Sequence, residues 1–433
     1  MPASPEEVDI LSDLRARCQA EHGVFWMREG ELGVFDPEAA QQVNAANFSD
    51  LTLPDRLVDL LLRRHSKPVS WKQVRAAWIA QLRRLTDTEG ISGLAARMDA
   101  LLAERLDRPL DLVWTAQQVC TQALVPIVVA GLSPADRRRV LRDQDHKLRR
   151  LLTIEAKRET FRDATRSILI QVGGGLVVRR ELRGRARGRR PRQLDLTDPI
   201  VDLLPDLGMD RAVDAVTAVL TAIAGPPGSA AACLVYELTR RPDWAARLTE
   251  ELAAVPPEQL YAAPMRVAPV THRFVKETLR MWTPPLLMTR GVRTDIDLER
   301  VSLKAGQRYF LSAYLIHHDP RHWKDPDVFD PDRWLSGAEN GPCSGTSYVP
   351  FGWSPRACIG ASLGTIQLIL LCHLLCTRYR IQVEDPEAVR MALVAVPLPR
   401  NLHGTIARLA GGRFPAVAPK EGGDATWRGS SAR

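Results

Sequence analysis

The chain has 433 residues, 45% of them hydrophobic, and a formal net charge of +8 at pH 7. No stretch approaches the length of a membrane span, and residues 1–7 have neither the basic start nor the apolar core of a signal peptide, so we expect a soluble, cytoplasmic, monomeric protein without a membrane contact. Seven cysteines, an odd number without a Cys-x-x-Cys pair, argue against a disulfide-stabilised fold.

The N-terminal half is predicted to be mainly helical, since its apolar residues recur every three or four positions. Its expected elements are a helix over 8–21, a hairpin of strands 24–27 and 32–35, a short helix capped by Asp36, and helices within 70–152 separated by breaks near 86–90, 108–109 and 131–134. A further helical stretch, interrupted by the three glycines at 173–175, ends near Arg183.

Much of the basic excess comes next, in eight arginines between Arg179 and Arg192. Glycines and a proline interrupt this run, so we expect a solvated loop. A basic protein can bind nucleic acid, a membrane surface or an acidic protein. No aromatic residue is interleaved with these arginines, which argues against single-stranded nucleic acid, and we expect no nucleic-acid partner.

The C-terminal half combines long helices with short strands, so the predicted fold class is mainly α with a small β region. The expected elements are one very long helix over 209–240, a helix over 256–281, short strands within 290–313 with a turn at 305–306, a loop over 319–350, and two closing strands near 379–383 and 403–409. Because no Gly/Ser- or Pro-rich linker divides the chain, we expect a single domain over residues 1–410, followed by a disordered tail over 411–433.

One cysteine has an unusual setting. Cys358 ends the run Phe-Gly-Trp-Ser-Pro-Arg-Ala-Cys over residues 351–358, and Gly360 precedes a long apolar helical pattern over 361–377. The amide groups of a helix N-terminus stabilise a thiolate and lower its pKa, and glycine leaves space for a flat group against the backbone. Such a thiolate suits one axial bond to the iron of a planar cofactor; the alternative is a buried structural cysteine.

This run resembles the haem-binding loop of the cytochrome P450 family, Phe-x-x-Gly-x-Arg-x-Cys-x-Gly, with Ser354 in place of the first glycine. The resemblance implies the cytochrome P450 fold and haem b, with Cys358 as the axial thiolate and iron ligand. It also implies that Phe351 packs beside the thiolate, that Gly360 gives the macrocycle room, and that Arg356 holds a propionate.

Two earlier segments resemble further haem contacts of the family. Trp71 and Arg75 lie one helical turn apart in a Trp-x-x-x-Arg pattern, which the family often uses to hold the propionates. Arg290 opens a predicted strand at the position of another propionate-binding residue. For each of these residues the alternative is ordinary packing or surface charge.

A Glu-x-x-Arg motif places Glu277 and Arg280 on one helix face. Together with the later segment that contains Arg333, it resembles the family's buried salt-bridge triad. The resemblance implies that Glu277, Arg280 and Arg333 form this triad and hold the loop behind the haem. Two clusters of possible metal ligands, around His317 and around Cys372, are expected to be structural instead.

The predicted long helix departs from the family pattern at residues 224–229, Ala-Gly-Pro-Pro-Gly-Ser. Pro227 stands where the family has an acid, and Gly228 where it has a threonine; this pair serves proton delivery during oxygen activation. Two prolines remove N–H donors and force a kink or local unwinding. The candidate catalytic residues are therefore Cys358, Gly225 and Ser229, whose hydroxyl lies one position late; water or the substrate could also deliver the protons.

The resemblance implies a haem-thiolate monooxygenase or oxidase that hydroxylates, desaturates or forms a bond in a small natural product, as a bacterial enzyme of secondary metabolism would. An acidic ferredoxin with its reductase would supply electrons at a basic face around Lys72, Arg83 and Arg84. The expected substrate contacts are Ala222, Gly225, Ser229, Leu286, Leu287, Met288 and Thr289.

Two alternatives stay open. The missing acid–alcohol pair suits a haem-thiolate enzyme that uses peroxide or does not oxygenate, such as a dehydratase, isomerase or coupling enzyme. The scaffold could also be a catalytically silent haem- or ligand-binding protein, because fold does not fix function.

Overall fold

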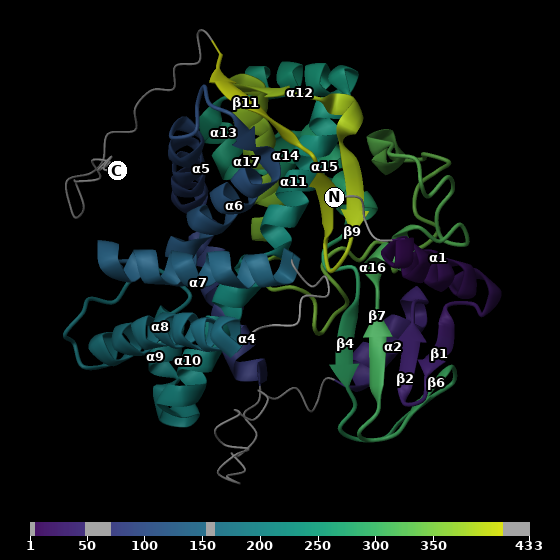
Figure 1. The fold of residues 1–433 in the computed structure, drawn as a ribbon, viewed down its shortest axis with the longest axis horizontal. Helices are drawn as coiled ribbons and strands as arrows, with labels where there is room; N and C mark the ends of the chain where they lie inside the picture. Colours follow the sequence, from purple (N-terminus) through teal and green to yellow (C-terminus); the bar gives the residue numbers. More distant parts are fainter. Residues whose placement is uncertain (1–4, 48–70, 153–160, 410–433) are drawn as a thin grey trace.

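The computed structural model describes residues 5–47, 71–152 and 161–409, and the predicted tail lies outside them. Helices fill one side of the molecule, and the largest sheet lies on the other side with α1 and α2 (Figure 1). The helices are α1 (Pro5–Ala20), α2 (Pro37–Ala46), α4 (Trp71–Leu85), α5 (Thr88–Ala103), α6 (Leu112–Val128), α7 (Pro134–Leu152), α8 (Phe161–Ala186), α9 (Asp198–Asp202), α10 (Leu204–Ile223), α11 (Pro226–Arg240), α12 (Pro242–Ala254), α13 (Pro257–Ala262), α14 (Pro264–Val267), α15 (Pro269–Met281), α16 (Ala313–His317) and α17 (Ala361–Thr377), with 3-10 turns η1 (Pro331–Trp334) and η2 (Pro386–Ala388).

Within the described residues, the strands form four small sheets. They are β1 (Val24–Arg28), β2 (Glu31–Val34), β3 (Leu110–Asp111), β4 (Met288–Gly291), β5 (Ile296–Leu298), β6 (Val301–Leu303), β7 (Arg308–Leu311), β8 (Tyr379–Val383), β9 (Arg390–Leu393), β10 (Pro397–Arg400) and β11 (His403–Arg408). The largest sheet has the order β1-β2-β7-β4, and its central pair, β2 and β7, is parallel. The predicted mainly α fold with a small β region is confirmed, although β3, β9 and β10 were not predicted.

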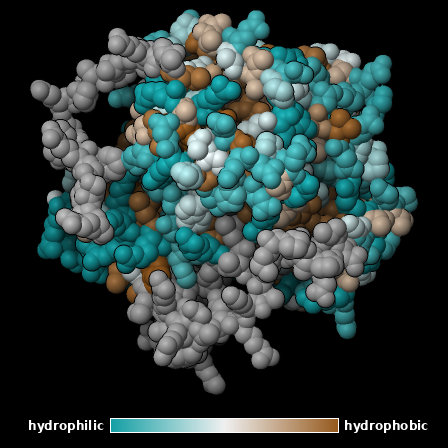
Figure 2. Space-filling model, turned by 45° about the horizontal axis from the view of Figure 1, so that its top comes forward, coloured by the Kyte–Doolittle hydropathy of each residue, from teal (hydrophilic) through white to brown (hydrophobic). Residues whose placement is uncertain are grey.

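The N-terminal hairpin forms where the sequence predicts it. β1 and β2 pair antiparallel, and the carboxylate of Asp36 accepts a 2.9 Å hydrogen bond from the Ala39 N–H at the start of α2. The parallel pairing of β2 with β7 joins this hairpin to residues far along the chain. The largest hydrophobic core lies among the helices, where α6, α11 and α17 contribute many of its fully buried residues. The face in Figure 2 is mainly hydrophilic, with apolar residues scattered over it.

Two sequence predictions about α8 are wrong. The three glycines do not interrupt the helix, because α8 lies alongside α7 (Figure 1) and a Cβ at Gly174 would be only 2.9 Å from the Asp143 carboxylate. The arginine run is not a solvated loop either. Its first half is the end of α8, and the fully buried Arg185 donates to both carboxylate oxygens of Asp195, at 2.8 and 2.7 Å.

The predicted helices at 209–240 and 256–281 are both divided. Prolines start α13, α14 and α15, because proline cannot continue a helix but suits its first turn. The predicted helix over 209–240 divides into α10 and α11 at residues 224–225, as Pro226 and Pro227 require. By length and composition, the helical segment Leu204–Arg240 could cross a membrane, contrary to the sequence expectation, and 61% of its most apolar window is buried inside the molecule.

Candidate active site

The loop before α17 presents the sulfur of Cys358 at its end. The Cys358 N–H donates to the Phe351 carbonyl at 2.8 Å and closes the loop, and Gly352 allows the turn because its φ is +75°. Arg75 of α4 donates to the carbonyls of Pro355 and Ala357 at 3.2 and 2.8 Å. The loop is therefore held from outside, and its cysteine is fixed in place.

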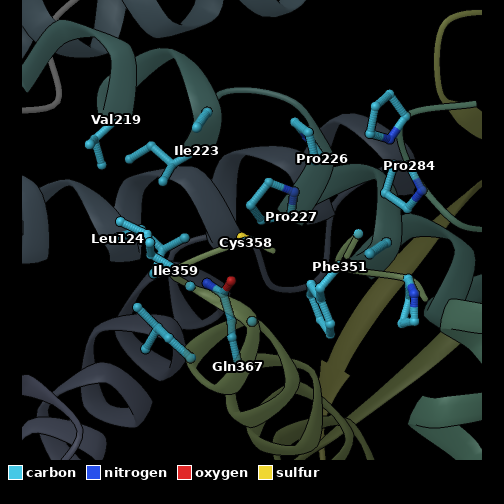
Figure 3. A pocket seen from close by; sticks show the side chains of 18 of the residues that line it. Leu124, Val219, Ile223, Pro226, Pro227, Pro284, Phe351, Cys358, Ile359 and Gln367 are labelled. Carbon is cyan, nitrogen blue, oxygen red and sulfur yellow. The ribbon is translucent and has the colours of Figure 1, made fainter. Parts of the chain in front are cut away.

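A cavity of about 440 Å³ opens above Cys358. In Figure 3, Pro227 lies above the sulfur, Gln367 lies below it, and Phe351 and Ile359 lie on either side. The lining is almost wholly apolar. The residues that α17 contributes, Leu363, Gly364, Gln367 and Leu368, were not predicted, although their spacing of three and four positions after Gly360 indicates one helix face.

The Cys358 thiol faces the cavity, yet protein surrounds it. Burial raises the pKa of the Cys358 thiol, while the N–H of Gly360 and the charge of Arg75 act to lower it. The sequence prediction of a lowered pKa is therefore wrong for the protein alone, because desolvation outweighs the helix N-terminus. Glycine keeps the space beside the sulfur open, since a Cβ at Gly360 would lie 3.8 Å from Sγ.

Four arginines lie close together beside the cysteine loop. Burial lowers the pKa of Arg356, and repulsion from Arg290, Arg293 and Arg75 lowers it further. None of the four forms an ion pair within the described parts of the chain, and the buried Nε of Arg356 has no hydrogen-bond partner. Arg75, Arg290 and Arg356 donate only to backbone carbonyls and, for Arg290, to a methionine sulfur among the described contacts. An apolar cavity with a thiol at its floor and guanidinium groups without carboxylate partners nearby fits a flat iron cofactor with anionic edge groups. Of these residues, Arg293 was not predicted.

The residues of the predicted triad are in direct contact and fully buried. Arg280 donates from Nε and Nη2 to the two oxygens of Glu277 at 3.0 and 2.8 Å, and Arg333 donates to Glu277 at 2.9 Å. All three side chains have 0% exposure. Arg280 also donates to the carbonyls of His317 and Pro326, so the triad ties α15 to the loop that follows α16.

The ring of His317 belongs to this structural network. Its Nε2 accepts from the Val349 N–H at 2.9 Å, and its Nδ1 lies 2.9 Å from the hydroxyl of Thr283. Burial lowers the pKa of His317 well below its usual value. Among the residues that the structure describes, no group of three or more His, Cys, Asp or Glu side chains could hold a metal ion.

The break between α10 and α11 forms the upper wall of the cavity. Pro226 and Pro227 line it, but Gly225 does not, and neither does Ser229. The Ser229 hydroxyl instead donates to the Pro397 carbonyl of β10 at 2.6 Å and is fully buried. A Cβ at Gly228 would lie 2.6 Å from the Cα of Gln117 on α6, so no threonine could stand there.

Of the other predicted substrate contacts, some line the cavity and some do not. Ala222 and Met288 line the cavity. Leu286 and Leu287 pack instead in the small core beneath the sheet, and Thr289 is exposed on β4. Alternation along β4 turns Met288 and Thr289 to different faces, and Leu286 and Leu287 precede this strand. The side chain of Trp71 lies outside the described residues.

Known proteins are similar to part of this sequence and share its fold. Residues 213–402 match the model of the cytochrome P450 family. The protein LUTEIN DEFICIENT 5, chloroplastic, of Arabidopsis thaliana is 34% identical over 167 residues, which are 37% of this chain and 28% of that protein. Thromboxane-A synthase of Mus musculus is 29% identical over 165 residues, which are 37% of this chain and 30% of the synthase. The matches thus span about a third or less of these relatives' lengths.

The fold agreement extends further than the sequence match. A zebrafish cytochrome P450 solved with progesterone has a TM-score of 0.74 at 18% identity, covering 94% of this chain and all of that one. The family match includes the broken helix, the buried triad and the cysteine loop. Residues 213–402 thus match the cytochrome P450 family, whose cofactor is a haem held by a cysteine thiolate, and the chain has the cytochrome P450 fold.

Proposed function

We propose that the chain is a haem-thiolate oxidase in which Cys358 is the axial ligand. The observation that carries this proposal is the apolar cavity with the Cys358 sulfur at its floor and four arginines without acidic partners nearby. When bound, the haem would supply the one-electron and oxygen chemistry that side chains lack. Arg356 and Arg290 would bind its anionic edge groups, and Arg75 would hold the cysteine loop.

The proposed substrate is a small, apolar natural product that undergoes hydroxylation, desaturation or oxidative bond formation. The lining supports an apolar ligand, because its polar side chains are already engaged: Thr283 donates to the Leu279 carbonyl, and Gln367 donates to the Cys120 carbonyl at 3.1 Å. A hydrocarbon surface would therefore be bound by shape and desolvation.

The proposed electron donor is an acidic ferredoxin with its own reductase. Lys72, Arg83 and Arg84 are exposed on α4, the helix from which Arg75 reaches the cysteine loop. A negatively charged donor attracted to α4 would therefore approach on the side of Cys358. We further propose a soluble, cytoplasmic, monomeric enzyme of bacterial type; cell fractionation and size-exclusion chromatography test its location and oligomeric state.

A second candidate function is oxidation driven by peroxide, or a haem-thiolate reaction without oxygenation. It is supported by the break between α10 and α11, where Pro227 and Gly228 stand at the positions that the resemblance gives to the acid and the alcohol, and where the Ser229 hydroxyl is hydrogen-bonded to Pro397. Within the described part of the lining, Cys358 is the only titratable side chain. Proton transfer that keeps pace with electron delivery would then require water or the substrate.

Spectral titration of the haem-loaded protein against an apolar metabolite library would first identify ligands. Turnover of each ligand would then be compared with ferredoxin and reductase against turnover with hydrogen peroxide. Product with the ferredoxin system supports the first function, and product with peroxide alone supports the second. Absence of haem uptake would contradict both.

A further inference from the structure

We propose that Gln117, on α6, is a positioning residue that fixes the height of the Pro226–Pro227 turn above Cys358 and so determines which ligands fit. The expected effect on ligand binding rests on the proposed function, whereas the contacts of Gln117 with the broken helix do not. Gln117 does not line the cavity, and its side chain is fully buried behind the broken helix. Its role would therefore be exerted through the two prolines.

The Gln117 amide spans the two prolines from behind. In the amide orientation that satisfies both of its atoms, the nitrogen donates to the Gly225 carbonyl and the oxygen accepts from the Ser229 N–H, each at 3.2 Å. These partners flank Pro226 and Pro227, which have no N–H of their own. The Gly225 carbonyl and the Ser229 N–H are also hydrogen-bonded to each other at 3.0 Å. The Gln117 amide therefore adds a second contact to each of these groups and ties the turn to α6.

A second α6 side chain satisfies the end of α10. Pro227 cannot donate to the carbonyl of Ile223, four residues earlier, and the Thr121 hydroxyl donates to that carbonyl instead, at 3.1 Å. Thr121 is one helical turn beyond Gln117, so both groups reach the break from one face of α6. The break is therefore stabilised by specific protein partners.

Close packing leaves little freedom at this contact. Gly228 lies so near α6 that a Cβ would be 2.6 Å from the Cα of Gln117 and would also clash with its side-chain amide. On the other side of α11, the Ser229 hydroxyl is hydrogen-bonded to Pro397 of β10. The start of α11 is thus held between α6 and β10, and the Gln117 amide sets its position relative to α6.

The test compares Gln117→Leu with the wild type and with Gln118→Leu as a matched control. Leucine has a similar volume but forms no hydrogen bonds. The neighbouring Gln118 accepts from Arg105 at 3.2 Å, away from the break. The first readout is amide hydrogen exchange of peptides covering residues 225–233, measured with and without haem. Gln117→Leu should speed exchange there about tenfold, and Gln118→Leu should not.

The second readout is ligand selectivity of the haem-loaded protein. Imidazole and 1-phenylimidazole are titrated optically, because the phenyl ring needs the space below the prolines. Gln117→Leu should change the ratio of the two affinities by about fivefold or more, whereas a loss of overall stability alone would leave the ratio unchanged. Thr121→Val, which also frees the break, should change the ratio in the same direction.

Unchanged exchange in Gln117→Leu overturns the positioning role, whether or not the protein takes up haem. Changed exchange with an unchanged affinity ratio overturns the claim of selectivity. Equal changes in Gln117→Leu and Gln118→Leu also overturn it. A wild type that takes up no haem contradicts the proposed function instead, and the exchange data still decide the role of Gln117.

Discussion

Replacing Arg280 with leucine tests the buried triad most severely. The guanidinium donates to both oxygens of Glu277 and to the carbonyls of His317, Pro326 and Val328. Leucine fills part of the volume but supplies no donor. The variant therefore removes one charge from a buried cluster and leaves several buried acceptors without their partner.

The expected loss of stability follows from the buried groups that Arg280→Leu leaves without a partner. Breaking a buried ion pair costs about 3–5 kcal/mol, and each orphaned carbonyl adds about 1–3 kcal/mol. Glu277 keeps Arg333, the Asp330 N–H and the Trp334 indole as donors, and the Val328 carbonyl keeps Arg333. The total therefore falls at the low end of these ranges, and we expect a loss of at least about 5 kcal/mol. That is comparable to the whole stability of many domains. Glu277→Leu should cost more, because it leaves two buried guanidinium groups uncompensated.

The assay is urea unfolding followed by circular dichroism, together with the yield of soluble, haem-containing protein. Arg15→Leu is the control, because Arg15 pairs with Asp327 at the surface and such pairs contribute about 1 kcal/mol or less. We expect little soluble Arg280→Leu protein and a normal yield of the control. An Arg280→Leu variant within about 1 kcal/mol of the wild type would refute the reasoning.

Three further predictions concern separate features. Gly228→Ala should destabilise the fold by about 2 kcal/mol or more, because the new Cβ meets the α6 backbone. Gly173→Ala is the control, because the space around Gly173 is open and the change should be neutral or stabilising. Equal thermal unfolding midpoints for the two variants would contradict the prediction. Burial, then Arg280, lowers the pKa of His318 to about 3, so between about pH 6.5 and 3 only the unfolded state binds its proton. His318 alone should therefore lower stability by up to about 1.4 kcal/mol per pH unit as the pH drops through this range, and the buried His317, whose pKa is also lowered, should add to the fall. His318→Gln should reduce that slope in urea titrations, and an identical slope would count against it. Arg75→Leu should lower haem retention, measured by dialysis, whereas Arg83→Leu on the same helix should not; equal loss would contradict the loop-holding role.

Patterns that depend on local chemistry could be predicted from the sequence. The hairpin, the cap at Asp36 and the helix division at the two prolines follow from backbone rules that act within a few residues. The cysteine loop and the triad could be predicted because their residue types and order are specific together. The structure places Cys358 at the end of its loop and brings Glu277 into contact with Arg333, while the role of Cys358 as the iron ligand stays a prediction.

Features that depend on tertiary packing could not be predicted in this way. Gly174 indicates a helix break by propensity, yet it packs against Asp143 and the helix continues. Ser229 looked available because its neighbours on β10 are far away in the sequence. Gln117 has no local signature at all, since its partners lie more than a hundred residues along the chain. Contacts of this kind become visible only when the elements are placed in space.

The absorption spectrum of the reduced, carbon monoxide-bound protein tests the central claim most directly. Wild type, Cys358→Ala and Cys372→Ala are compared; Cys372 is a fully buried cysteine on α17 that does not border the cavity. The wild type and Cys372→Ala should both show the red-shifted Soret band of thiolate-ligated iron, and Cys358→Ala should lack it. Survival of that band in Cys358→Ala would contradict the assignment of Cys358 as the iron ligand, and with it the proposed function.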